Sequence, residues 1–253
     1  MPYKNFKKHF TSNRANNVMK KIIAKKKILF IVLIASLITL PLLIVECGYR
    51  YGLHLFRELP SVQAYQPLPS IVTNGIWASF SEKAPPRVKP LMPWNILEDE
   101  VLGCDSPGAK ITNYVSRRLL EIEGPSPRML TWHLQEFSLT VWLSRNWPTE
   151  RIIHEAGNQI VICREASSID KLANKLFDKN SDALEAHEIA LIMAAGKGGF
   201  VHAGESLQNQ LLKRRNQILE RMLKNGAISE GDYTTSRNQP ITSLQQDLIE
   251  CRN

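Results

Sequence analysis

The run TERIIHEAGN, residues 149–158, sets His154 beside Glu155 between apolar neighbours and ends on Asn158. Imidazole and carboxylate groups are the side chains most often used for general acid–base chemistry near neutral pH. The pattern is helix-like, so these groups would be held on a regular scaffold. The run is therefore a candidate active-site helix. Such chemistry depends on whether the required side chains are present in this run and elsewhere in the chain.

Other chemical motifs are absent or incomplete. Residues 196–199, GKGG, lack the spacing of a phosphate-binding loop, which favours a flexible connection. The sequence has no GxSxG and no HExxH, and His187 is expected on a helix surface. Cys47, Cys104, Cys163 and Cys251 have no metal-ligand spacing, so no zinc site is predicted. A disulfide between two of the last three cysteines stays open, and the pair cannot be chosen.

The positive charge of the chain is concentrated at its N-terminus. The formal net charge is +8, but residues 1–27 hold nine Lys or Arg and no Asp or Glu. The remainder has 23 basic and 24 acidic residues. A nearly neutral body excludes nucleic acid as a partner, because nucleic-acid binding needs a basic face.

The basic tail leads into ILFIVLIASLITLPLLIV, residues 28–45, which carry no charge. At about 1.5 Å per residue this run nearly crosses a hydrocarbon core of roughly 30 Å. It is longer than the apolar region of a signal peptide, and no small-x-small cleavage site follows. We expect a transmembrane anchor over residues 28–46. Lys and Arg flanking a span stay in the cytoplasm, so residues 1–27 are predicted to be cytoplasmic and the body to lie outside.

The body is predicted to be mainly α-helical. Residues 59–108 are rich in proline and are expected to form irregular chain with short helical pieces, including a membrane-proximal linker over 47–69. Long helical patterns follow, broken at 124–127, at Trp147-Pro148, around 164–170, at 196–199 and at Asn225-Gly226. Residues 207–224 form an amphipathic pattern with Lys213, Arg214, Arg215 and Glu220 off the apolar face, and residues 128–145 form a more apolar central helix.

Four segments in order resemble glycosyltransferase family 51, the peptidoglycan glycosyltransferase (monofunctional transglycosylase) domain. They are GAKITNYVSRRLL (108–120), RMLTWHLQE (128–136), WPTERIIHEAGN (147–158) and the blocks over 183–233 that end in RRN, a Leu and Met pair, Asn-Gly, Ile and Tyr. The resemblance covers about residues 70–240 and leaves 241–253 as a C-terminal tail. It implies a lysozyme-like helical fold and work on a lipid-linked sugar at the outer face of a bacterial inner membrane.

The resemblance implies basic groups that neutralise a lipid pyrophosphate. Gly108, Ile111, Thr112 and Arg117 match the family pattern, whereas Asn113 and Tyr114 stand where it has two glutamines. Arg128, Leu130 and Glu136 also match, but Trp132 and His133 replace an Arg and a Lys. The substrate-binding residues carried over are Arg117, Arg118, Arg128, His133, Glu136 and Asn158. Solvated helix charges are the alternative reading.

The catalytic carboxylates that the resemblance implies match poorly. Aligning residues 75–95 with the first acidic motif puts Phe80 and Ser81 where the family has Glu and Asp, with Glu82 two residues on. A second alignment uses Glu98-Asp99, but Gly108 then follows Asp99 by only nine positions. On the helix 149–158, His154 stands at the second catalytic Glu. Glu155 is turned by about 100° from it and cannot simply replace it.

The sequence therefore leaves open whether the protein is an enzyme. The first expectation is a membrane-anchored periplasmic protein that binds lipid-linked cell-wall precursor or glycan with degenerate catalytic residues. The alternatives are an active, divergent peptidoglycan glycosyltransferase and a non-catalytic envelope scaffold. Glu82, Glu98 and His154 are the candidate catalytic residues. No resident cofactor is predicted, and a divalent metal is a candidate only if the chain is active. The expected partners are inner-membrane lipid, lipid-linked precursor or glycan strand, and proteins of the cell-wall or envelope machinery.

Overall fold

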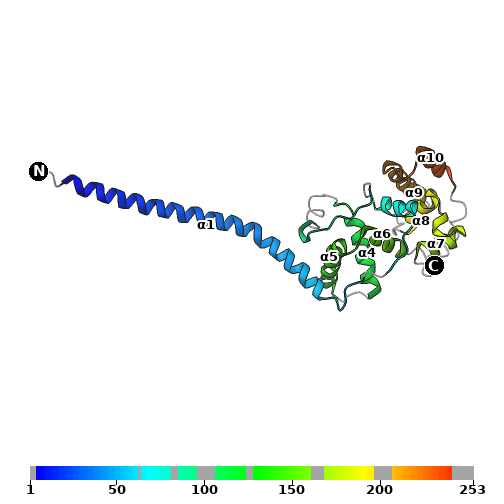
Figure 1. Cartoon of the computed structure of the whole chain (residues 1–253), viewed down its shortest axis with the longest axis horizontal. Helices are drawn as coiled ribbons and strands as arrows, with labels where there is room; N and C mark the ends of the chain where they lie inside the picture. The colour runs from blue at the N-terminus through cyan, green and yellow to red at the C-terminus, as the bar shows by residue number, and fades with distance from the viewer. Residues whose placement is uncertain are drawn as a thin grey trace. The chain divides into compact units, whose positions relative to one another are not determined.

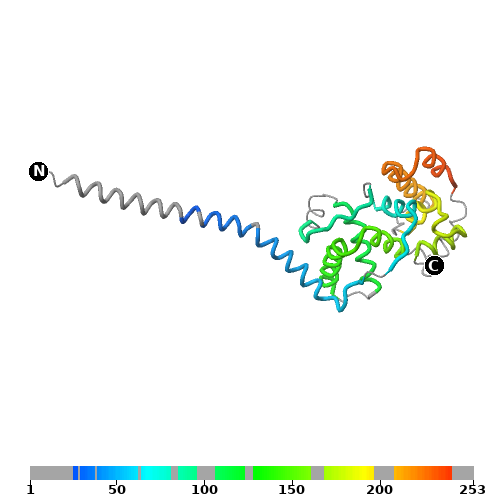
Figure 2. The backbone as a smooth tube through the Cα atoms, viewed as in Figure 1, coloured from blue at the N-terminus to red at the C-terminus, as the bar shows by residue number. Residues whose placement is uncertain are grey.

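A computed structural model describes residues 4–61, 64–80, 85–95, 106–123, 128–160, 168–196 and 207–240, which are coloured in Figure 1. Figure 2 shows the same backbone as a smooth tube. The chain divides into two compact units, Met1–Gly48 and Tyr49–Asn253. The candidate residues Glu82 and Glu98 and the cysteines 104, 163 and 251 lie outside the described residues. Cys47 is exposed, and its thiol is free.

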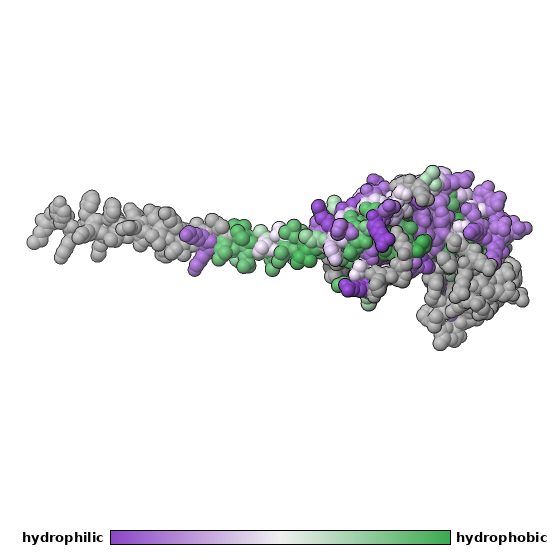
Figure 3. Space-filling model, turned by 90° about the horizontal axis from the view of Figure 1, so that it is seen from below, coloured by the Kyte–Doolittle hydropathy of each residue, from purple (hydrophilic) through white to green (hydrophobic). Residues whose placement is uncertain are grey.

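The first helix is α1, Lys4–His54, and it contains the apolar run. Its stretch Lys25–His54 is long and apolar enough to cross a membrane, and its apolar side chains are drawn in green in Figure 3. The hydroxyls of Ser36 and Thr39 donate to the carbonyls of Leu33 and Ala35, which pairs the polar side chains within the helix itself. The helix continues beyond the expected anchor, through residues 47–54 of the expected linker.

The body is helical, and its described residues contain no strand, which confirms the mainly α prediction. Figure 1 shows the elements in order. They are α2 (Ser70–Ser79), α4 (Ala109–Glu123), α5 (Met129–Asn146), α6 (Thr149–Asn158), α7 (Ile169–Phe177), the short 3-10 helix η1 (Ser181–Ala183), α8 (Ala186–Gly196), α9 (Leu207–Lys224) and α10 (Glu230–Asn238). The described part of the proline-rich stretch carries α2 and otherwise little helix, as expected.

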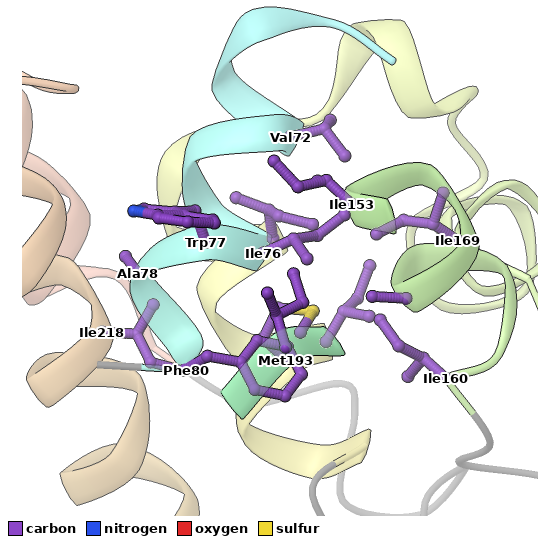
Figure 4. Packing of buried hydrophobic residues seen from close by; sticks show 14 of the residues in the cluster. Val72, Ile76, Trp77, Ala78, Phe80, Ile153, Ile160, Ile169, Met193 and Ile218 are labelled. Carbon is purple, nitrogen blue, oxygen red and sulfur yellow. The ribbon is translucent and has the colours of Figure 1, made fainter. Parts of the chain in front are cut away.

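The short helix α2 occupies the centre of the body. It packs against α6, α8 and α9, and six of its ten residues are buried. Figure 4 shows Val72 and Ile76 beside Ile153 of α6, with Phe80 near Ile218 of α9. Burying such apolar side chains contributes about 1.5–3 kcal/mol each. α2 is therefore the element on which three others converge.

Two glycines permit the close approach of helices to α2. A Cβ added at Gly75 would lie 2.8 Å from Cγ1 of Ile189 on α8. A Cβ added at Gly157 on α6 would lie 3.0 Å from Cδ1 of Ile76. Ordinary side chains at these positions would push the helices apart, so the glycines set the spacing of the core.

Several helix ends follow local sequence rules. α5 ends at Asn146 and α6 begins after Pro148, as predicted from Trp147-Pro148. α9 ends before Asn225-Gly226, and Gly226 has a φ of 70°. The amides of Gly226 and Ala227 donate to the carbonyls of Leu223 and Met222, which is the Schellman arrangement that favours glycine.

The structure corrects two expectations about polar side chains. Arg215 was placed off the apolar face of its helix, but it is 1% exposed. Its guanidinium donates to the carbonyls of Arg237 and Gln239, so it binds the C-terminal end of α10 to α9. His187, expected on a helix surface, has a side chain that is only 17% exposed, in the first turn of α8.

We predict opposite effects for two helical Gly→Ala substitutions. Gly231→Ala on α10 should raise the free energy of unfolding by about 0.5–1 kcal/mol, because alanine favours helix and the new Cβ meets nothing closer than 3.7 Å. Gly75→Ala should lower the free energy of unfolding by about 1–2 kcal/mol, because the contact with Ile189 outweighs the same helix preference. Denaturant unfolding of both variants measures this, and stabilisation by Gly75→Ala would contradict the close packing.

Candidate functional site

The start of α4 is fixed by a glycine turn. Gly108 has a φ of 84°, and a Cβ there would lie 2.7 Å from Cα of Val88. The Thr112 hydroxyl donates to the Gly108 carbonyl at 2.7 Å, and the Lys89 amide donates to the Pro107 carbonyl at 3.1 Å. Gly108 and Thr112, two residues that match the family pattern, thus position the helix that carries Asn113 and Arg117.

Four polar side chains meet between α4 and α5, and we call Asn113, Arg117, His133 and Glu136 the α4–α5 polar cluster. The Asn113 amide donates to Glu136 Oε1 at 3.2 Å, and Arg117 Nε lies 3.3 Å from the same oxygen. His133 Nδ1 lies 3.5 Å from Glu136 Oε2. The Glu136 side chain is 10% exposed, whereas those of Arg117 and His133 are 50% exposed. A nearly buried carboxylate therefore organises two surface groups.

An aromatic ring completes the cluster. The Arg117 guanidinium carbon lies 5.2 Å from the centroid of Trp132, a cation–π distance. The Trp132 and His133 rings meet edge to face, with centroids 5.0 Å apart. In the sequence, Trp132 and Asn113 stand out only as departures from the family pattern. Their contacts make them part of the site.

The remaining basic candidates lie apart from the cluster. Arg118 pairs with Glu121 at 2.6 Å, and its guanidinium carbon lies 5.4 Å from the centroid of the Tyr114 ring. Arg128 is exposed at the N-terminal end of α5. Of the four basic groups assigned to pyrophosphate, Arg117 and His133 are brought together within the part of the chain that the structure describes.

Residue 80 lies in the core. Phe80 caps the C-terminal end of α2, is 7% exposed and packs against Tyr114 with ring centroids 5.2 Å apart. The Tyr114 hydroxyl donates to the Gln159 carbonyl at 3.1 Å. Burial raises the pKa of the Tyr114 phenol, although its hydrogen bond with Arg118 acts in the opposite sense. This position holds two aromatic rings, and neither carries charge near neutral pH.

On α6, His154 packs against another aromatic ring. Its ring centroid lies 5.1 Å from that of Tyr65, and Asn158 Nδ2 lies 3.2 Å from His154 Nδ1. Burial, followed by the positive charge of Arg151, lowers the pKa of His154 below its usual 6.5. His154 is thus held as a neutral ring. It contacts Tyr65 and Asn158, which do not belong to the α4–α5 polar cluster.

The Glu155 carboxylate contacts one residue within its own helix and one residue just after the end of that helix. It lies 2.9 Å from Arg151 Nη2 and accepts a hydrogen bond from Gln159 Nε2 at 2.8 Å. Arg151 also lies between two rings, 5.4 Å from the centroid of Tyr65 and 5.0 Å from that of Trp147. Arg151 is none of the site residues that the family resemblance implies, but its i,i+4 spacing to Glu155 in the sequence indicates such a pair.

Among the described residues, no group of three His, Cys, Asp or Glu side chains gathers closely enough to hold a metal ion. The positions for which the family resemblance implies a catalytic carboxylate fall into two classes. Residues 80 and 154 are described and hold rings, whereas Ser81, Glu82 and Glu98 lie outside the described residues.

Comparison with known proteins identifies the domain. Residues 103–223 match the family described as Transglycosylase. The chain is also similar to penicillin-binding protein 1A of Aquifex aeolicus (strain VF5), with 27% identity over 140 residues. That match covers 55% of this chain and 19% of the relative, so the chain spans about a fifth of the relative's length. Together these matches support a transglycosylase domain of glycosyltransferase family 51 over residues 103–223.

Proposed function

We propose that this protein is a membrane-anchored, peptidoglycan glycosyltransferase-like protein that binds lipid-linked cell-wall precursor or glycan and does not polymerise it. The transglycosylase domain and the similarity to a penicillin-binding protein 1A support the glycosyltransferase-like part. One observation carries the rest. At both positions where the family resemblance implies a catalytic carboxylate, a ring packs on another ring, Phe80 on Tyr114 and His154 on Tyr65.

These aromatic contacts support a loss of acid–base chemistry. Phenylalanine has no proton to exchange, and Phe80 is buried among apolar side chains. Glu155 follows residue 154 in the sequence, but Arg151 and Gln159 already hold its carboxylate. Catalysis tolerates little displacement, since an error of about 1 Å can reduce a rate on the order of a hundredfold. A carboxylate held by other partners one residue away is a poor substitute.

The α4–α5 polar cluster supports retention of binding. Arg117 and Glu136 match the family pattern and contact each other, and half of the Arg117 side chain is exposed to a ligand. The cluster includes neither residue 80 nor residue 154, so it can persist after catalysis is lost.

The N-terminal helix supports the proposed location. Lys25–His54 has the length and apolar character of a membrane span, and the nine Lys or Arg of residues 1–27 precede the apolar run. By the positive-inside rule the N-terminus is cytoplasmic and the body is periplasmic, in the inner membrane of a bacterium. The body would then stand where lipid-linked precursor is presented.

We predict that the detergent-solubilised full-length chain forms no glycan polymer from lipid-linked disaccharide-peptide, even with Mg²⁺ supplied. It should nevertheless bind the fluorescently labelled precursor. Arg117→Gln should weaken that binding about tenfold, because a hydrogen bond from a charged group contributes about 1.5–3 kcal/mol. Gel analysis of labelled glycan reads polymerisation, and fluorescence anisotropy reads binding.

Glu→Gln variants discriminate among the alternatives. Polymer that disappears in Glu82→Gln or Glu98→Gln, but persists in Glu220→Gln, would establish an active divergent enzyme and overturn the proposal. Glu220 is a suitable control because it pairs with Lys224 on the surface of α9. Absence of polymer, together with absence of binding to both precursor and glycan, would also overturn the proposal, in favour of an envelope scaffold.

We predict that His154 makes the fold less stable in mild acid. Because the pKa of His154 is lowered in the folded chain, the unfolded chain takes up the proton first as the pH falls below about 6.5. The free energy of unfolding should therefore fall between pH 7.5 and 5, and His154→Gln should flatten part of this slope. Burial lowers the pKa of His187 as well, so His187→Gln serves as the comparison. Equal slopes for wild type and His154→Gln, measured by urea unfolding at each pH, would refute this role.

A further inference from the structure

The α4–α5 polar cluster is compensated in charge. Arg117 is the permanent cation of the cluster, and its Nε lies 3.3 Å from the Glu136 carboxylate. His133 contributes a charge only when it is protonated. Arg118, the next residue along α4, has its own carboxylate in Glu121 at 2.6 Å. Two adjacent arginines are therefore each matched by a glutamate.

This balance does not suit a pyrophosphate. Diphosphate groups are bound by an excess of positive charge, supplied by Arg, Lys or a metal ion. A diphosphate contacting Arg117 would also lie within a few ångströms of the Glu136 carboxylate. Glu136 is 10% exposed, so water screens this repulsion poorly. The anion would have to compete with an existing partner for Arg117.

The same side chains suit an uncharged sugar. Asn113, Arg117 and His133 supply hydrogen-bonding groups beside the partly exposed ring of Trp132. Binding sites for neutral polar ligands combine an aromatic surface with a few oriented polar groups. Glu136 acts as a positioning residue, because it holds Asn113 and Arg117 in place while remaining nearly buried.

We propose that the α4–α5 polar cluster and Trp132 bind the uncharged sugar units of a glycan strand in preference to a lipid pyrophosphate. This rests on the proposed function, since it names which part of a cell-wall ligand the domain recognises. Replacement of two basic residues by Trp132 and His133 then changes the ligand preference of the site, whereas it would merely weaken a pyrophosphate site.

The test is titration calorimetry on the full-length chain in nanodiscs, with a β-1,4-linked N-acetylglucosamine tetrasaccharide and inorganic pyrophosphate as separate probes. The tetrasaccharide should bind, and pyrophosphate should neither bind measurably nor displace it. Trp132→Ala should weaken tetrasaccharide binding about threefold to tenfold through loss of the aromatic surface. Ile122→Ala, which truncates a 74% exposed side chain on α4, should leave it unchanged.

A charge variant tests the explanation itself. Glu136→Gln keeps the shape of the side chain but removes the negative charge, so pyrophosphate binding, absent in the wild-type chain, should become measurable. No gain in this variant would overturn the charge argument. Pyrophosphate binding by the wild-type chain that is lost in Lys110→Gln, about two turns before Arg117 on the same face of α4, would overturn the proposal.

Different results would contradict the sugar preference and the proposed function. If the chain binds labelled lipid-linked precursor, but pyrophosphate competes with it and the tetrasaccharide does not, the sugar preference is wrong and the proposed function stands. If the chain binds neither the precursor nor the tetrasaccharide, the proposed function falls, and the sugar preference falls with it.

Discussion

The close packing of α2 is the constraint on which the rest of the body depends. Gly75 lets α2 approach α8, and Gly157 lets α6 approach α2, so three helices share one small element. Phe80 directly follows that element and is drawn into the core with it. A charged group at the same position would lose its hydration, at a cost of several kcal/mol unless it found a partner. The packing of the core therefore limits which chemistry the side chain of residue 80 can supply.

Local sequence rules predict the helix boundaries better than they predict the partners of side chains. The break at Trp147-Pro148 and the end of α9 at Asn225-Gly226 follow from proline and glycine chemistry within a few residues. The burial of Arg215 depends on carbonyls more than twenty residues away, so an amphipathic pattern assigns it to the wrong face. Proposals about Glu82 and Glu98 stay predictions, because both lie outside the described residues.

The sequence predicts several residues of the candidate site but not the contacts that these residues make. Arg117, His133 and Glu136 were identified from motif positions, yet their contacts depend on how α4 packs against α5. That packing brings in Asn113 and Trp132 and leaves Arg118 with Glu121. A list of basic residues therefore overstated the positive charge that a ligand would meet, because the sequence does not reveal which cations already have carboxylate partners.

The Phe80–Tyr114 contact also has an evolutionary meaning. Under the proposed function, a ring in place of a carboxylate at the end of α2 would add apolar contacts to the core, so stability would rise as the ability to exchange protons disappeared. Reversal is harder, because a glutamate restored at residue 80 would enter an environment already filled by aromatic and aliphatic side chains. The proposed loss of catalysis would therefore be hard to reverse, since the packing of the core would have to change together with the chemistry of the site.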